Sequence, residues 1–242
     1  VTGTEAKRRH DDLCASIDSE MDEAFGSVNE RRKEAASRSL KSFIDAYMLG
    51  FVLEEKPSKM TYKAIDELEK ALLDNRPVQI QLPRGSGKTT LASIAVLYLL
   101  STARRKFAVI VSQNARSATN ILADIWRMVI EESPYSVDFP EMSRPFQICN
   151  GAYRRRQTFR GISTALTKNA TTIVFPRLLD ENGNDLPTSG AAIATRGIGS
   201  GIRGLKFPAP TGRPDCVLLD DLLDAKSAAS EDTNEKLLSI IR

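Results

Sequence analysis

Residues 81–90 read QLPRGSGKTT, a short turn with two glycines placed directly before Lys-Thr-Thr. The stretch VQI (78–80) before it predicts a strand, and the apolar run LASIAVLYLL (91–100) predicts a helix after it. A strand, a glycine turn and a helix in this order let backbone amides and the helix N-terminus converge on phosphate oxygens. Leu82 stands where the usual motif has its first glycine, but Gly85 and the unchanged loop length preserve the turn. The alternative interpretation is a chance Gly-Lys-Thr before an ordinary helix.

Side chains of this loop have defined roles if it binds a nucleotide. Lys88 would reach the β- and γ-phosphates, and the Thr89 hydroxyl would bind Mg²⁺. The sequence lacks the NKxD stretch of GTPases and the LSGGQ stretch of transporter ATPases, so we expect ATP with Mg²⁺ as the cofactors. The loop residues expected to bind the nucleotide are Arg84, Gly85, Ser86, Gly87, Lys88, Thr89 and Thr90.

A second acidic element follows about 130 residues later. The stretch DCVLLDD (215–221) predicts an apolar strand that ends in the adjacent carboxylates Asp220 and Asp221. At the C-terminal end of a strand both side chains can turn into a cleft, so Asp220 would hold the Mg²⁺ together with Thr89. Asp221 would polarise the attacking water. The alternative is a strand followed by a helix N-cap, which DDLLDAKSA would also satisfy.

The positive charge of the chain is concentrated in one region. Between Ser143 and Pro214 there are 11 Lys and Arg residues but only 3 acids, although the net charge of the whole chain is +3. A basic surface of this kind attracts polyanions, and the alternative is a solvated face without a partner. Within the region, YRRRQTFRG (153–161) interleaves bases with aromatic residues. Arginines in such a run suit sequence-independent contacts with a nucleic-acid backbone, so those expected to bind DNA are Arg154, Arg155, Arg156 and Arg160; the alternative is an exposed loop that binds no nucleic acid.

Composition excludes several classes of protein. Hydrophobic residues make up 41% of the 242 residues and charged residues 27%, which are ordinary globular values. The longest apolar run has ten residues (91–100), too few to span a bilayer, so we expect a soluble protein with no membrane contact. Three widely spaced cysteines and one histidine argue against a disulfide framework or a zinc cluster and favour a reducing compartment.

Helical stretches dominate the first third of the chain. Residues 4–50 predict helices, with a break at 24–30 where Ser27 or Asn29 can act as an N-cap. A linker at 54–59 precedes a third amphipathic helix, which is expected to end near Leu73. We therefore expect a helical N-terminal appendage at residues 1–50.

Strands and helices alternate in the remainder, which predicts an α/β domain over residues 51–242. The stretches expected as strands are 78–82, 106–113, 171–176, 190–195 and 215–221, and those expected as helices are 88–102 and 115–133. The strands at 171–176 and 190–195 are expected to pair. This order favours a mostly parallel central sheet with helices on both faces.

Five motifs together resemble the large terminase subunit of tailed bacteriophages. In chain order they are LPRGSGKTT, VIVSQNARSATNILADIWRMV, YRRRQTFRG, GSGIRGLKF and RPDCVLLDDLLD, and the resemblance covers about residues 40–242. It implies a RecA-like (ASCE) P-loop ATPase that drives double-stranded DNA into a procapsid. In that family a nuclease domain follows the ATPase domain. The sequence is therefore expected to be C-terminally incomplete, without the family's coupling motif and nuclease domain, and not to cut DNA.

The resemblance also implies roles for single residues. Arg84 would sense or stabilise the γ-phosphate, or else hold the loop through a salt bridge. Arg203 in GIRG would enter the site of a neighbouring subunit, or else bind a surface acid. Gln113, at the end of VIVSQ, would face nucleotide or DNA, and Tyr62 would stack on adenine unless it is a core tyrosine.

Partners follow from the same resemblance. It implies double-stranded DNA, the portal protein and the small terminase subunit, with a ring formed on the portal and a monomer in solution. The expected location is the cytoplasm of a host bacterium, outside the mature virion. Two other functions stay open: a helicase or remodelling ATPase that acts on nucleic acid, and an adaptor that binds nucleotide without turnover.

Overall fold

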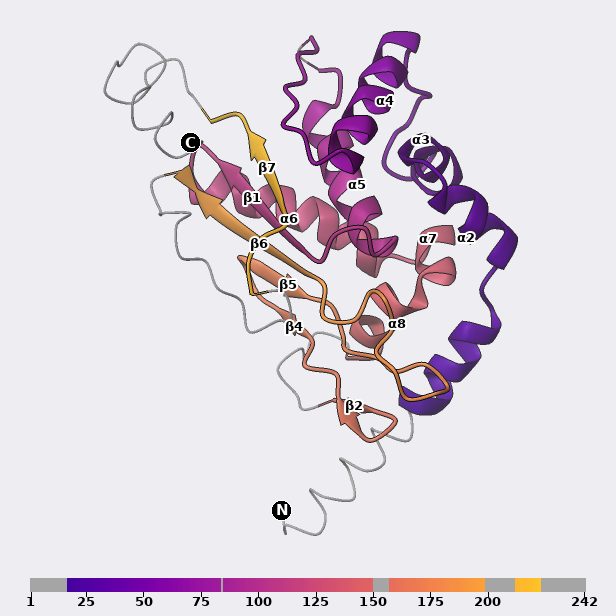
Figure 1. Ribbon diagram of the computed structural model, residues 1–242. Coiled ribbons are helices and arrows are strands. Elements are labelled where there is room, and N and C mark those ends of the chain that lie inside the picture. The colour runs from indigo at the N-terminus through magenta and orange to yellow at the C-terminus, as the bar shows by residue number, and fades with distance from the viewer. Residues whose placement is uncertain (1–16, 84, 150–156, 199–211, 223–242) are drawn as a thin grey trace.

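The computed structural model describes residues 17–83, 85–149, 157–198 and 212–222. Within these ranges the chain is an α/β protein, with a mixed five-stranded sheet and a layer of helices (Figure 1). None of the described helices combines the length and the apolar character that a bilayer-spanning segment needs.

Helices form the first part of the described chain. In order they are a helix at 17–26, α2 (Glu30–Ser37), α3 (Leu40–Phe43), the π-helical turn η1 (Ile44–Met48) and α4 (Lys59–Leu73). Asn29 caps α2, because its side chain accepts a hydrogen bond from the Arg32 amide. The break before α2 and the extent of α4 are therefore confirmed, with Asn29 and not Ser27 as the cap.

In the part of the chain that the structure describes, four helices follow the glycine turn: α5 (Lys88–Ser101), α6 (Ala115–Ile130), α7 (Pro134–Asp138) and α8 (Pro140–Cys149). The prediction of one helix over 115–133 is wrong at its end. Ser133 caps a new helix through a reciprocal bond with Ser136, and Pro134 takes the first helical position. Proline is favoured at that position because its missing N–H has no helical acceptor there.

The main sheet has the strand order β4-β5-β6-β1-β7. Its strands are β1 (Phe107–Ser112), β4 (Thr167–Lys168), β5 (Thr172–Val174), β6 (Ala192–Gly197) and β7 (Cys216–Asp220). Strands β6, β1 and β7 are mutually parallel, whereas β5 runs antiparallel to both of its neighbours, β4 and β6. The pairing of β5 with β6 is confirmed, but the sheet is only partly parallel. A separate hairpin joins β2 (Thr158–Phe159) to β3 (Ile162–Ser163).

The strand predicted at 78–82 is absent: residues 77–83 form no ladder with any described strand. Prolines stand at both ends of this segment, Pro77 and Pro83, and neither can donate a backbone hydrogen bond. Val78 is exposed, while Ile80 and Leu82 pack on the main core. The alternating side chains therefore anchor the segment to the helices without sheet pairing.

The core lies mainly between the helices and one face of the sheet. Ala108 and Ile110 of β1 join Ile193 of β6 in a cluster that also contains side chains of α2 to α8. On the opposite face Phe107, Val109 and Val111 form a second cluster with two alanines of β6. Among the described residues, the helices that share a cluster with the sheet pack on the face of Ala108, Ile110 and Ile193. The sequence predicts helices on both faces, and the described residues show them on this face.

Strand β7 is less buried than its sequence predicts. Parallel register sets Val217 beside Val109 and Leu219 beside Val111. Val109 and Val111 are fully buried, but Val217 is 50% and Leu219 40% exposed. The expectation of a strand at 215–221 is confirmed, and its complete burial is wrong, because β7 ends the described sheet.

Candidate nucleotide-binding site

The glycine turn before α5 has the backbone conformation that its sequence suggests. Gly85 and Gly87 have φ values of +77° and +72°, in the left-handed region that favours glycine. Gly87 is the N-cap of α5 and supplies no side-chain hydrogen bond to the helix. The first amides of α5 therefore remain available for an anion, which the helix dipole also favours.

Lys88 folds back over this turn. Its Nζ donates to the carbonyl oxygens of Leu82, at 2.5 Å, and Pro83, at 3.0 Å. The Ser86 hydroxyl donates to the same Pro83 oxygen at 2.8 Å. The lysine ammonium thus lies against the loop that precedes its own helix, where a bound phosphate chain would meet it. No pattern in the sequence predicts these two backbone acceptors.

Thr89 meets Asp220 at the start of α5. The Thr89 hydroxyl donates to Oδ1 of Asp220 at 2.9 Å, although 131 residues separate the two in the chain. Asp220 is the last residue of β7, and both side chains are half-buried. The structure therefore brings together the two residues expected to hold the metal.

This oxygen pair fits a magnesium ion. Neighbouring ligands of an octahedral Mg²⁺ shell lie about 3.0 Å apart, because each is ~2.1 Å from the metal at a right angle, and the hydrogen-bonded oxygens of Thr89 and Asp220 are 2.9 Å apart. Among the described residues no group of three or more His, Cys, Asp and Glu side chains could form a metal cage. Mg²⁺ does not need one, since it is commonly bound by one or two protein oxygens together with substrate phosphates and water.

Asp221 and Gln113 follow the ends of neighbouring parallel strands. Ser112 of β1 is in register with Asp220, so Gln113 and Asp221 each stand one residue beyond that pair. Asp221 is exposed and has a φ of +44°, which ends the alternation of side chains along β7. The carboxyl edge of the two strands thus carries an amide and two carboxylates, and one of these carboxylates, that of Asp220, contacts Thr89.

A close approach at Gly197 fixes the third strand end at this edge. Gly197 ends β6 in register with Ser112. A Cβ built on Gly197 would lie 2.7 Å from the backbone nitrogen of Ala115 in α6. Only glycine permits this contact, and sequence reasoning missed it, because nothing in the sequence marks this glycine apart from its neighbours.

Other expected site residues have different surroundings. Thr90 is half-buried in the first turn of α5. The Tyr62 hydroxyl donates to Asp45 at 2.7 Å, and the Lys41 ammonium lies 4.9 Å from the Tyr62 ring centroid. Burial, aided by the hydrogen bond to Asp45, raises the pKa of Tyr62 to about 12. Tyr62 of α4 therefore contacts residues of α3 and η1, within the layer of helices.

Several predicted residues cannot be placed. Arg84, Arg154, Arg155, Arg156 and Arg203 lie outside the described residues. Arg160 is described, and it contacts the helix at 17–26 through Asp18 and Asp22. Its guanidinium also lies 5.0 Å from the ring centroid of Phe159.

Comparisons of this chain with protein-family models, curated proteins and solved structures find no match.

Proposed function

We propose that this chain binds and hydrolyses Mg-ATP and is the motor domain of a DNA-packaging terminase. The contact of Thr89 with Asp220 at 2.9 Å carries this proposal. It joins a phosphate-binding type of loop to an acidic strand end, which is the pairing that nucleotide hydrolysis requires. An ordinary helix start or an ordinary N-cap would have no reason to bring these two motifs together.

The fold supports a RecA-like arrangement in coarse terms. Strands β6, β1 and β7 are parallel, and the carboxyl end of β7 contacts the N-terminus of α5 through Asp220 and Thr89. Ligands of α/β proteins bind outside the carboxyl ends of such strands. Segment 77–83 leads into the loop without sheet pairing, so the described residues lack the strand that a RecA-like fold would have before this loop.

Residues at the start of α5 and at the end of β7 have separate roles in this proposal. The Lys88 ammonium exchanges its carbonyl partners for phosphate oxygens, and the first amides of α5 bind the same phosphates. Thr89 and Asp220 would hold Mg²⁺, which neutralises phosphate charge when bound. Asp221 orients the attacking water and accepts its proton.

Nucleotide binding and hydrolysis are tested on four variants. Lys88→Ala removes the phosphate cation, so ATP affinity should fall about 10- to 100-fold. Asp220→Asn should weaken binding mainly in the presence of Mg²⁺. Asp221→Asn should bind ATP normally but hydrolyse it roughly 10²- to 10⁴-fold more slowly. Fluorescent-nucleotide titration and phosphate release measure the two steps. Asp124→Asn, an exposed acid on α6, is the matched control.

Two results separate this function from its rivals. Normal ATP binding by Lys88→Ala would contradict a nucleotide site at this loop. Binding without phosphate release from the wild-type protein would favour the adaptor.

The second part of the proposal is that ATP hydrolysis drives translocation of duplex DNA. The 11 bases and 3 acids between Ser143 and Pro214 support a nucleic-acid partner. A packaging motor should have its ATPase rate stimulated more by duplex DNA than by single strands. Greater stimulation by single strands, with strand separation in a fluorescence unwinding assay, would instead identify a helicase.

A further inference from the structure

The helix at residues 17–26, here called the acidic helix, is docked by its apolar side. Ile17 and Met21 are fully buried and pack with Phe159 of β2 and with Leu178. Figure 1 shows this helix in indigo beside β2. Burying side chains of this size contributes about 1.5–3 kcal/mol each, so apolar packing is sufficient to hold the helix in place.

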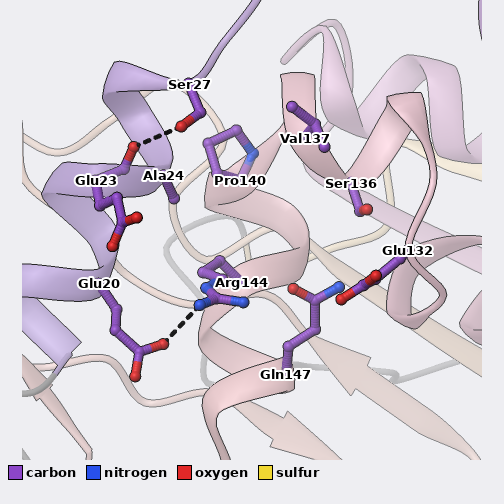
Figure 2. Close-up of a pocket in the computed structure, with 10 residues that line it drawn as sticks. All are labelled: Glu20, Glu23, Ala24, Ser27, Glu132, Ser136, Val137, Pro140, Arg144 and Gln147. Atoms are coloured by element: carbon purple, nitrogen blue, oxygen red, sulfur yellow. Dashed lines mark hydrogen bonds and ion pairs between the residues drawn. The ribbon is translucent and has the colours of Figure 1, made fainter.

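Acids on the two flanks of the acidic helix meet two arginines of the basic region. Arg144 Nη2 contacts Glu20 Oε2 at 2.8 Å, and Arg160 Nη2 contacts Asp22 Oδ1 at 3.0 Å. The Arg160 backbone N–H also donates to Asp18 at 2.9 Å. Figure 2 shows Arg144 extending from α8 toward Glu20. Acids of one helix thus neutralise two separate bases.

These ion pairs are poor candidates for holding the fold together. The side chains of Arg144 and Glu20 are 38% and 36% exposed, and those of Arg160 and Asp22 are 32% and 62% exposed. Exposed pairs of this kind contribute at most about 1 kcal/mol. Their main consequence is electrostatic, because each carboxylate offsets the positive charge of one arginine.

The contact with α8 is also open to solvent. A cavity of about 320 Å³ separates the acidic helix from α7 and α8, with Glu20, Glu23, Glu132 and Arg144 in its lining (Figure 2). Arg144 therefore reaches Glu20 beside a hollow and not across a packed interface. Its flexible side chain can change partner without displacing the helix.

We propose that Arg144 and Arg160 belong to a surface for duplex DNA, and that the acidic helix competes with the DNA phosphates for both arginines. This inference rests on the proposed DNA-dependent function and adds a means of regulating it. The carboxylates occupy the arginines in the free protein, and phosphates replace them when DNA binds. The acidic helix thus sets a threshold for DNA binding that depends on salt.

Neutralising the acids tests the competition directly. In the full chain, Glu20→Gln/Asp22→Asn should bind a short fluorescent DNA duplex about tenfold more tightly at ~50 mM salt, because two arginines are released. The slope of log affinity against log salt should steepen by up to about two. Fluorescence anisotropy measures both quantities. Glu34→Gln/Glu67→Gln makes the same change of charge in two exposed ion pairs elsewhere, and should have little effect.

A second set of variants assigns the gain to the two arginines. Adding Arg144→Ala and Arg160→Ala to the neutralised acids should abolish the tighter binding. Circular dichroism and the thermal midpoint verify that each variant folds. Equal affinities of the neutralised and control proteins, or a gain that survives loss of both arginines, would overturn the inference.

The two proposals fail in different assays. ATP titration of the same proteins tests the nucleotide site and does not involve Arg144 or Arg160. A chain that gains DNA affinity on neutralisation but binds no ATP would retain the acidic-helix inference and lose the nucleotide proposal. A chain that binds ATP but shows no gain would do the reverse.

Discussion

Gly197 shows how a single hydrogen in place of a side chain can position a strand end. Its Cα stands against the start of α6, and a methyl group there would meet backbone atoms of Asn114 and Ala115 within 3.2 Å. Backbone cannot rotate away as the end of a long side chain can. The spacing of β6 and α6, and with it the edge that carries Gln113, depends on this residue.

Gly197→Ala should therefore lower the free energy of unfolding by about 1–3 kcal/mol, because the strand end or the helix must shift. Urea denaturation measures the loss. Gly26→Ala is the matched control, since no atom lies within 4 Å of the added carbon and its φ is not positive. It should change stability little, or raise it by up to about 1 kcal/mol. Similar losses from both variants would argue against the close approach.

At the scale of an element, one face of the sheet is buried at β1 and exposed at β7. Val109 of β1 and Val217 of β7 are in register, so their side chains project from the same face. One is fully buried and the other is 50% exposed. Apolar side chains at the end strand of a sheet also make self-association a hazard.

Valine-to-threonine changes at these two positions separate the two environments. Val109→Thr should cost about 1–3 kcal/mol, because a hydroxyl is transferred into an apolar cluster. Val217→Thr should change stability by less than about 0.5 kcal/mol, because its hydroxyl reaches water. Chemical denaturation of both proteins provides the comparison. If Val217→Thr destabilised the protein as much as Val109→Thr, the assignment of Val217 to an exposed face of β7 would be contradicted.

At the scale of the whole molecule, one buried carboxylate attaches the N-terminal helices to α7. Asp138 accepts hydrogen bonds from the backbone N–H of Asn29, from Arg32 Nε at 2.5 Å and from the Tyr47 hydroxyl at 2.8 Å. Burial acts to raise the pKa of Asp138, but the bonds from Arg32, Tyr47 and Asn29 outweigh it, and the pKa lies below its usual value of 3.8. The ionised carboxylate is therefore favoured by folding.

Asp138→Asn should lower the free energy of unfolding by roughly 2–3 kcal/mol at neutral pH, since Arg32 loses its counter-charge. A depressed pKa stabilises the fold above the unfolded-state value of about 3.8, and this stabilisation is lost as the pH falls through the folded-state pKa. The difference between wild type and variant should thus be constant above about pH 4 and shrink below it. Thermal unfolding across pH checks this, with Asp124→Asn as an exposed control. A difference that grew toward acid pH would contradict the assignment.

Much of this arrangement could be predicted where the determining interactions are local. The cap at Asn29, the glycine turn and the pairing of β5 with β6 depend on residues that are close in sequence. The short helix α8 could not be predicted, because Pro145 interrupts its pattern. The pairing of Arg160 with Asp22 could not be predicted either, since the two are 138 residues apart and only the docked helix brings them together.

The distance in sequence between Thr89 and Asp220 has a consequence for biosynthesis. Residues 81–90 leave the ribosome long before β7 is made, so the loop is initially without its acidic counterpart. Closing so long a segment of chain is slow compared with forming a helix. Under the proposed function, a nascent chain that ends before residue 220 would therefore lack the Thr89–Asp220 pair, and nucleotide would begin to protect the protein from proteolysis only after β7 has joined the sheet.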